Sequence, residues 1–300
     1  MAATTAAALA LPATAHAATP TAPEVTAQQP REAADTPTVL APGGAVGRIT
    51  PGSGSTVGVG MPVSVAFDKP VTNEKAVQSA IQVTSTGHQD VVGHWFGRTR
   101  LDFRPRHYWE PDSEVTVRIG GAQNETVAFH IGRSQISTVD AETKTMTVVR
   151  DGERVKTFKV SAGAPDSPTY NGQMVISEKR DEMRMNGSTV GFTDEDGRPA
   201  YDIPDVPHAM RLSSSGTFIH GNYWGSEDVF GSVNTSHGCI GLRDVKGGQD
   251  PDTPGAWFYD HSLVGDIVVV TRSDGRTIRP DNGFGDWNLS WNAWTKGSAT

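Results

Sequence analysis

The sequence predicts a mainly β protein made of two strand-rich domains. Charged residues are only 20% of the 300 residues, while 33 glycines and 19 prolines supply many turns. This composition is typical of short strands joined by tight turns rather than of a helical bundle. A chain of this length can hold one large domain or two ordinary ones, each with its own core.

The first 20 residues are interpreted as the remnant of a signal peptide. Residues 1–20 form an Ala-, Leu- and Thr-rich tract in which Ala15-His16-Ala17 supplies the small-x-small pattern of a cleavage site. The tract lacks a basic start, and a disordered Ala-rich leader is the alternative interpretation. It is too short and too interrupted for a transmembrane helix. We therefore expect an exported protein without a transmembrane segment.

A linker and a β-sandwich are predicted between residues 21 and 132. Residues 21–47 are rich in Ala, Thr, Pro and Glu with few large apolar side chains, which predicts a flexible linker. Residues 48–132 predict an antiparallel β-sandwich, because turn residues separate short apolar runs that often alternate with period two. These runs lie at 57–67, 81–83, 91–92, 101–103, 115–119 and 127–131. The histidines of this region match no metal-site spacing: His88, His94, His107 and His130.

Residues 133–274 predict a second β-rich domain. Asp151-Gly152 separates two alternating runs at 145–150 and 153–160. Asp-Gly is a strong hairpin signal, because both turn residues must accept a positive φ. Further strands are predicted at 173–177, 217–220 and 266–271, and a short helix or turn at 252–263.

Residues 275–300 predict a docking segment. Trp287, Trp291 and Trp294 are spaced i, i+4 and i+7, which places them on one face of a helix. We interpret this face as a stripe that packs the C-terminus onto the main domain. A face for stacking ligands is the alternative.

The charge balance and the single cysteine narrow the class of function. The net charge is −8 and no Lys/Arg cluster occurs, so the sequence does not indicate a nucleic-acid binder. Cys239 is the only cysteine and cannot form an intramolecular disulfide. It is a buried apolar residue, an intermolecular bridge or a reactive thiol.

The neighbours of Cys239 favour a reactive thiol. The attacking species is the thiolate, so the thiol needs a base, and His237 and His220 are both available. Gly238 lets the chain bend, and the amides of Gly238 and Cys239 are candidate donors to an oxyanion. Cys239, His237 and His220 could also supply three zinc ligands, although no Cys-x-x-Cys or His-Glu-x-x-His pattern supports a metal site. A purely structural role for the cluster is the remaining alternative.

Ser236-His-Gly-Cys239, with His220-Gly221 upstream, resembles the active-site signature of the L,D-transpeptidase family, whose catalytic domain is of the YkuD type. The resemblance covers roughly residues 135–297. The chain is similar to mycobacterial-type members of the family in three further segments, 257–261, 265–268 and 285–291. The preceding sandwich resembles the immunoglobulin-like domain of these enzymes. The implied fold is an immunoglobulin-like β-sandwich followed by a YkuD-type β-rich catalytic domain with a short Trp-rich C-terminal helical segment.

The resemblance implies roles for individual residues. Cys239 is expected to be the nucleophile and His220 its general base, with the backbone carbonyl of Gly221 selecting the tautomer of the imidazole. His237 and Gly238 are expected to line the oxyanion region. No metal or cofactor is implied. The expected substrate-binding residues are Tyr201, Met185, Trp224, Ser236 and Arg243.

Two positions depart from the family pattern. Gly221 stands where many members have Ser, a change we expect to be tolerated because only the carbonyl is required. Gly241 stands where many members have Arg or Asn, two residues after the cysteine. Arg243 could take over a contact with an anionic substrate, or that contact could be missing.

The resemblance also implies a reaction and a location. The thiolate would attack a tetrapeptide stem of peptidoglycan, release D-alanine, and pass the acyl group to a diaminopimelate amine, giving a 3→3 cross-link. Carbapenem-type β-lactams would acylate the same thiol. The alternatives are an L,D-carboxypeptidase that uses water as acceptor and a non-catalytic wall-binding module. The expected location is the cell envelope or cell wall outside the cytoplasmic membrane.

Overall fold

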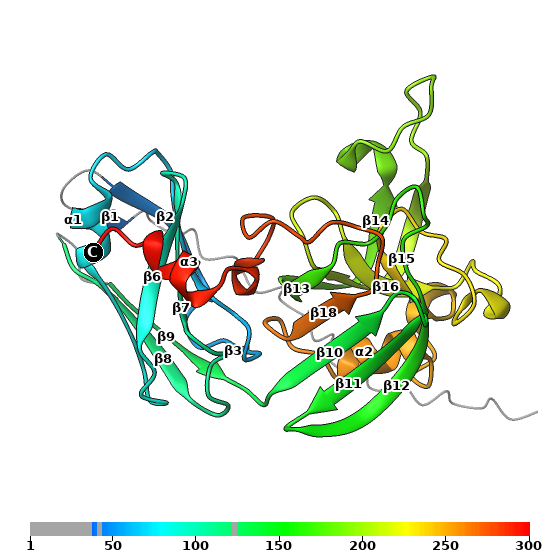
Figure 1. The fold of residues 1–300 in the computed structure, drawn as a ribbon, viewed down its shortest axis with the longest axis horizontal. Helices are drawn as coiled ribbons and strands as arrows, with labels where there is room; N and C mark the ends of the chain where they lie inside the picture. Colours follow the sequence, from blue (N-terminus) through cyan, green and yellow to red (C-terminus); the bar gives the residue numbers. More distant parts are fainter. Residues whose placement is uncertain (1–37, 41–43, 122–124) are drawn as a thin grey trace, which may run out of the picture. The chain divides into compact units, whose positions relative to one another are not determined.

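The computed structural model describes residues 38–40, 44–121 and 125–300, and these residues form a mainly β protein (Figure 1). The predicted signal-peptide remnant, residues 1–20, lies outside the described residues. The linker prediction for residues 21–47 is wrong at its end, because β1 (Thr38–Leu40) pairs antiparallel with β2 (Gly44–Thr50). The linker was predicted because this segment has few large apolar side chains. Strands pair through backbone hydrogen bonds, which do not depend on such side chains.

The first domain is the predicted sandwich, with sheet orders β1-β2-β4-β7-β6 and β3-β9-β8-β5. Its pairs are antiparallel except for β3 with β9. One short helix, α1 (Glu74–Ser79), precedes β5. The remaining strands are β3 (Thr56–Val57), β4 (Val63–Phe67), β5 (Ile81–Ser85), β6 (Val91–Phe96), β7 (Arg100–Pro105), β8 (Glu114–Ile119) and β9 (Glu125–Ile131).

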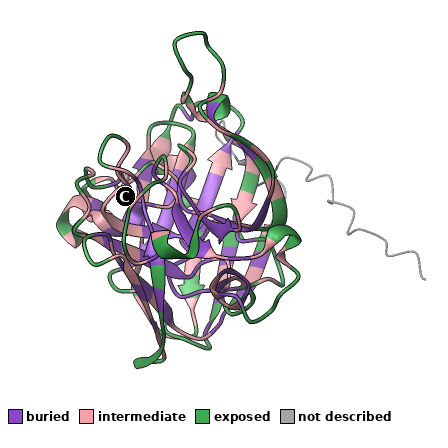
Figure 2. Cartoon of the chain, turned by 90° about the vertical axis from the view of Figure 1, so that its right-hand side faces the viewer, coloured by how far each residue is buried: buried purple, intermediate pink, exposed green. Residues whose placement is uncertain are grey.

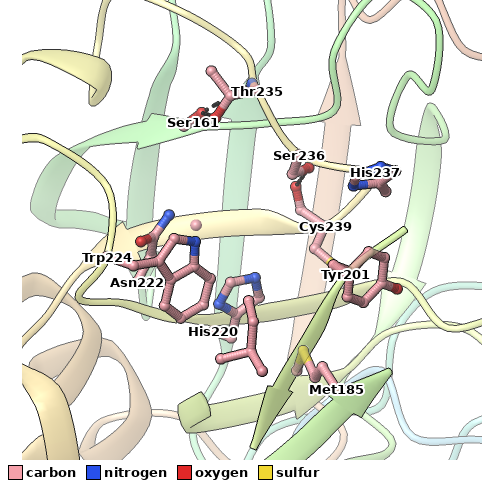
Figure 3. A pocket seen from close by; sticks show the side chains of 12 residues that line it. Ser161, Met185, Tyr201, His220, Asn222, Trp224, Thr235, Ser236, His237 and Cys239 are labelled. Atoms are coloured by element: carbon pink, nitrogen blue, oxygen red, sulfur yellow. Dashed lines mark hydrogen bonds between the residues drawn. The ribbon is translucent and has the colours of Figure 1, made fainter. Parts of the chain in front are cut away.

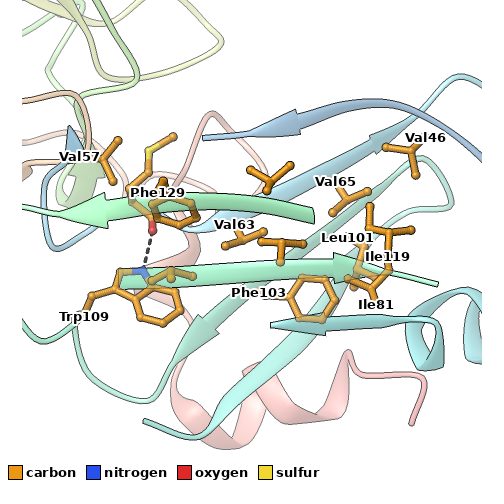
Figure 4. Packing of buried hydrophobic residues seen from close by; sticks show 14 of the residues in the cluster. Val46, Val57, Val63, Val65, Ile81, Leu101, Phe103, Trp109, Ile119 and Phe129 are labelled. Carbon is orange, nitrogen blue, oxygen red and sulfur yellow. Dashed lines mark hydrogen bonds between the residues drawn. The ribbon is translucent and has the colours of Figure 1, made fainter. Parts of the chain in front are cut away.

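Alternating side chains build the core of this sandwich. Val115, Val117 and Ile119 of β8 are buried, while the residues between them are more exposed, as a strand with one face on the core requires. Trp109 is buried beside Phe129, and its indole N–H donates to the Met61 carbonyl at 2.7 Å (Figure 4). That bond satisfies the one polar atom of a large apolar side chain.

The second domain contains a nine-stranded sheet in the order β13-β18-β10-β11-β12-β17-β16-β15-β14. Two neighbouring pairs, β10–β18 and β16–β17, are parallel and the others are antiparallel. Its strands are β10 (Gln135–Asp140), β11 (Thr145–Arg150), β12 (Glu153–Ser161), β13 (Gly172–Val175), β14 (Glu178–Asn186), β15 (Asp202–Arg211), β16 (Phe218–Asn222), β17 (Ile240–Arg243) and β18 (Ile267–Thr271). Short 3₁₀ turns lie at η1 (Gly187–Val190), η2 (Glu227–Val229) and η3 (Lys246–Gly248).

The predicted hairpin at Asp151-Gly152 is confirmed. Both residues have positive φ, 49° and 83°, and β11 and β12 pair antiparallel on either side of them. The hairpin of β14 and β15 is a finding that the sequence pattern did not predict. Most of β14 is charged or exposed, so it lacks the apolar alternation that marks a half-buried strand.

The helix α2 (Pro254–Asp260) supports the strands that carry the site. Thr253 caps its start, with Oγ1 accepting from the Ala256 amide at 3.2 Å, and Pro254 occupies the first turn, where a missing N–H costs nothing. Phe258 is buried, and the helix contacts β15, β16 and β17. In Figure 2 the buried residues concentrate on the central strands, and the loops around them are largely exposed.

The C-terminal tryptophans are arranged differently from the prediction. Ser290 caps α3 (Trp291–Lys296), so Trp287 lies before that helix, in the 3₁₀ turn η4 (Asp286–Asn288), and the three rings do not share one helix face. The indoles of Trp294 and Trp287 bond to the first sandwich, while the backbone carbonyl of Trp287 accepts from Gln173 Nε2 of the second domain at 3.1 Å. The Trp294 indole donates to the Val92 carbonyl at 2.9 Å, and the Trp287 indole donates to that of Gly60 at 2.7 Å.

The guanidinium of Arg104, on β7, holds this segment. Its carbon lies 4.6 Å from the Trp287 ring centre and 4.3 Å from that of Trp294, within the range of cation–π contacts. Arg104 also donates to the Leu289 carbonyl at 2.9 Å. Within the described ranges, no helix is long and apolar enough to cross a membrane.

Candidate active site

The parallel pair β16–β17 positions the site. His220 on β16 stands opposite Gly241 on β17, and Cys239 directly precedes β17. A pocket opens beside them, and Figure 3 shows Cys239 and Tyr201 on one side of it, Asn222 on the other and His220 between them. Most of the predicted site residues line this pocket: Met185, Tyr201, His220, Trp224, Ser236, His237 and Cys239.

The surroundings of the Cys239 thiol favour its protonated form. The side chain is half-buried, and its Sγ lies 3.6 Å from the Gly216 carbonyl oxygen, which accepts the thiol proton. Burial raises the pKa of the Cys239 thiol to about 11. A thiol reacts as a nucleophile in its thiolate form, so a reaction at Cys239 would need a base to take this proton.

His220 lines the same pocket, and the structure defines its tautomer. Its Nδ1 lies 2.9 Å from the Gly221 carbonyl oxygen, and a carbonyl can only accept, so Nδ1 carries the proton and Nε2 keeps a free lone pair. Burial lowers the pKa of His220 below its usual 6.5, against a smaller opposing effect of the Gly221 hydrogen bond. The imidazole is therefore neutral at pH 7 and able to accept a proton.

Trp224 covers the imidazole from the solvent side. Its indole stacks on the His220 ring with 5.6 Å between ring centres and 14° between planes, and the tryptophan is 44% exposed. A flat apolar cover of this kind limits the rotation of the imidazole.

A buried carboxylate lies behind the base. Asp244 accepts from His208 Nδ1 at 2.7 Å, from Thr253 Oγ1 at 3.0 Å and from the Val245 amide at 2.8 Å. Its charge raises the pKa of His220, as a minor effect beside burial, and it would stabilise an imidazolium formed when His220 takes a proton. Neither Asp244 nor His208 is marked by a sequence motif, because the two meet only through the fold.

Gly221 leaves the space that Asp244 fills. A Cβ at position 221 would lie 2.1 Å from Asp244 Oδ2, well inside contact distance. The backbone φ of Gly221 is not positive, so the requirement is for space and not for conformation. Glycine at position 221, where many family members have Ser, therefore leaves room for the buried Asp244 carboxylate.

We expect Gly221→Ala to destabilise the protein by about 1–3 kcal/mol, because the Cβ would push against a carboxylate held by three hydrogen bonds. Urea unfolding of both variants checks this. Gly52→Ala is the matched control, since nothing lies within 4 Å of a Cβ there, and it should stay within about 0.5 kcal/mol of the parent. Equal stability of the two variants would show that Asp244 is free to move.

Ser236 stabilises the loop before Cys239 through two hydrogen bonds of its hydroxyl. Its Oγ donates to the Cys239 carbonyl at 2.5 Å and accepts from the Gly238 amide at 3.1 Å. Gly238 has a φ of 110°, a conformation that a residue with a Cβ rarely adopts. The Gly238 amide is therefore directed at Ser236 in this structure, whereas the expectation placed it in the oxyanion region.

His237 is enclosed by aromatic rings of the flap, the β14–β15 hairpin with its connecting residues 187–201. Its ring centre lies 5.2 Å from that of Phe192 and 5.0 Å from that of Tyr201. Burial, and to a lesser degree the nearby Cys239, raises the pKa of Tyr201 to about 12, so its hydroxyl stays protonated and can donate. Met185 lies at the end of β14 and faces the same pocket.

Arg243 does not belong to the pocket. Its Nη1 lies 3.2 Å from Glu227 Oε1, and both side chains are exposed.

The pocket residues that the sequence did not indicate as site residues are Ser161, Ile203, Asn222, Thr235 and Gly241. Asn222 could have been found, because it lies two residues after His220 on one strand and so shares its face. In the part of the chain that the structure describes, no group of three or more His, Cys, Asp or Glu side chains is arranged to hold a metal ion.

Fold and site together are those of a two-domain enzyme of the acyl-transfer class. Residues 134–270 match the family model of the L,D-transpeptidase catalytic domain, YkuD, and residues 5–123 match that of the bacterial Ig domain. The chain belongs to the L,D-transpeptidase family, and its resemblance to that family and its predicted fold class are confirmed.

Similar proteins and solved structures support the assignment to this family. The chain is 34% identical over 262 residues to L,D-transpeptidase 2 of Mycobacterium tuberculosis, covering 84% of this chain and 62% of that relative. The structure of L,D-transpeptidase LdtMt1 in complex with imipenem is 31% identical, with a TM-score of 0.66, covering 77% of this chain and all of that one. L,D-transpeptidase 3 of Mycobacterium tuberculosis with a faropenem-derived adduct is 27% identical, with a TM-score of 0.62, covering 76% and 98%.

Proposed function

We propose that this protein is a peptidoglycan L,D-transpeptidase that forms 3→3 cross-links through an acyl-enzyme on Cys239. The observation that carries the proposal is a thiol and a neutral imidazole in one pocket, with the imidazole tautomer selected by the Gly221 carbonyl. Membership of the L,D-transpeptidase family supports the substrate class. Its place of action is the cell envelope, where peptidoglycan stems are found.

In the first half-reaction, His220 Nε2 takes the thiol proton as Sγ attacks the carbonyl carbon of the L,D-amide in a tetrapeptide stem. A C–S bond forms, and the Tyr201 hydroxyl and the Cys239 amide are the donors proposed for the oxyanion. The C–N bond then breaks, and the His220 imidazolium gives its proton to the departing amine of D-alanine. The enzyme is left as a thioester with neutral His220.

In the second half-reaction, the side-chain amine of a diaminopimelate in another stem attacks the thioester carbonyl. His220 takes a proton from that amine as the new C–N bond forms, and the C–S bond breaks. The proton returns to the sulfur, so the thiol and the neutral imidazole are restored. Asp244 stabilises the imidazolium in both halves through its position behind Gly221.

A single assay tests the proposal. Purified disaccharide-tetrapeptide is incubated with the enzyme, and the cross-linked dimer and the free tripeptide acid are measured together by mass spectrometry. We expect the dimer, with release of D-alanine. Free acid without dimer would make the protein an L,D-carboxypeptidase, and neither product from a folded sample would indicate a non-catalytic wall-binding module.

A further inference from the structure

The side chain of Asn222 lies over a gap in the neighbouring strand. Asn222 is two residues beyond His220 on β16, so both side chains face the same side of the sheet. On β17, Gly241 stands opposite His220 and has no side chain. A Cβ at Gly241 would lie 3.4 Å from Asn222 Nδ2 and 3.5 Å from its Cβ. The amide of Asn222 therefore extends beside the bare backbone of Gly241, and both residues line the pocket of Cys239.

The orientation of this amide is determined by a turn. Asn222 Oδ1 accepts from the Gly225 backbone amide at 2.8 Å. Because a backbone N–H can only donate, the atom facing it has to be the oxygen, and the opposite end of the side chain is Nδ2. Figure 3 shows the Asn222 side chain beside Trp224 at the pocket. Within the described residues, Nδ2 makes no hydrogen bond, and it is not one of the fully buried unpaired polar atoms, so it stays accessible from the pocket.

Among the described residues, no cationic side chain lines the pocket, and three of its hydroxyls are already engaged: Ser161 Oγ with the Val233 carbonyl, Thr235 Oγ1 with Ser161 Oγ, and Ser236 Oγ with the Cys239 carbonyl. Neither Lys nor Arg lines it, and Arg243 is engaged with Glu227 outside it. A peptide stem presents carbonyl and carboxylate oxygens, which need donors once water is displaced. Asn222 Nδ2 can only donate, so its chemistry matches that need.

We propose that Asn222 is a substrate-positioning residue whose Nδ2 donates to an acceptor oxygen of the donor stem. It supplies from β16 the polar group that Gly241 does not supply from β17. The inference rests on the proposed function, because the ligand is the stem peptide of that reaction. The hydrogen bond orients the stem relative to Cys239 and takes no part in proton transfer.

Asn222→Asp separates this role from a structural one. The aspartate keeps an oxygen that accepts from Gly225 and loses the donor, so the turn stays intact while the stem oxygen meets a second acceptor. We expect kcat/KM for dimer formation to fall about tenfold or more, mainly through KM, with an unchanged melting temperature. Reaction of Cys239 with iodoacetamide, which makes no stem contact, measures separately any effect of the new carboxylate on the thiol.

The double variant Asn222→Ala with Gly241→Asn tests the exchange of positions. A Cβ at Gly241 meets only ordinary contacts of 3.4–3.6 Å, and its φ is not positive, so the asparagine can be accommodated. We expect Asn222→Ala alone to lose about tenfold in kcat/KM and the double variant to recover most of it. A purely structural role at the Gly225 turn would not be rescued from position 241.

The outcomes separate the two proposals. If the parent enzyme forms no dimer, the proposed function fails. If the parent is active and Asn222→Asp stays within twofold of it, the inference on Asn222 is wrong. It is also wrong if Asn222→Ala alone is impaired and the double variant is not improved. A donor stem whose terminal carboxylate is replaced by a carboxamide identifies the oxygen that Asn222 binds. If Asn222→Asp no longer lowers kcat/KM with this stem, the oxygen belongs to the terminal carboxylate. If Asn222→Asp still lowers it, the oxygen belongs to a backbone carbonyl.

Discussion

Cys239→Ala should abolish dimer formation, with a loss of at least about 10⁴-fold, because it removes the only thiol of the chain, and the hydroxyls of the pocket are much weaker nucleophiles at neutral pH. The fold should remain intact, since the half-buried thiol contributes about 1 kcal/mol or less to the free energy of unfolding. Product analysis after incubation with disaccharide-tetrapeptide checks the activity, and thermal melting checks the fold.

Intact-protein mass spectrometry with a carbapenem gives an independent readout of the same thiol. The parent should gain the mass of one β-lactam, and Cys239→Ala should gain none. Continued dimer formation by the variant would refute Cys239 as the nucleophile. Absence of an adduct on the folded parent would refute the reactive thiol itself.

His220→Gln should slow acylation by about 10²–10⁴-fold, the usual contribution of general-base catalysis. Glutamine fills much of the same space and places an amide group near the position of Nε2, but it cannot take the thiol proton at neutral pH. Stopped-flow acylation by a carbapenem measures the rate directly. His237→Gln is the matched control, because His237 lines the same pocket and lies among the rings of Phe192 and Tyr201. A near-normal rate for His220→Gln together with a slow His237→Gln would move the base to His237.

The pH dependence of acylation follows from the same residues. Burial lowers the pKa of His220, so the basic form persists to lower pH than for an exposed histidine, and the acid limb of the profile should lie below pH 6.5. His220→Gln should remove that limb. Burial raises the pKa of Cys239 to about 11, so alkylation by iodoacetamide should still be increasing above pH 9. An alkylation rate that is already maximal at pH 7 would show that the thiolate is formed in the resting enzyme.

Much of this protein could be predicted from short stretches of sequence. Alternation in the run 115–119 gave a strand with one buried face, since successive side chains of a strand point to opposite sides. Asp151-Gly152 gave a hairpin, because few other dipeptides accept two positive φ angles. The spacing of His220 and Cys239 suggested a thiol with a base. Each of these predictions depends only on residues that are close together in the sequence, so a short stretch of sequence is enough to make it.

What remained depends on residues that meet only after folding. The β14–β15 flap carries mostly charged and exposed side chains, and pairing with neighbouring strands holds it in place. Asp244 reaches His208 across 36 positions of sequence, and no motif connects them. The C-terminal tryptophans dock on the first sandwich because Arg104 and the carbonyls of Val92 and Gly60 face them there.

The sequence by itself determined the class of fold and indicated Cys239 and His220 as a candidate thiol and base. Only the tertiary structure decided how the polar atoms around them are arranged: His220 Nδ1 is bonded to the Gly221 carbonyl, the Gly238 amide is turned to Ser236, and Asn222 lies beside Gly241. The physical reason is that hydrogen-bond direction and the space at a glycine depend on strand register, which long-range pairing sets.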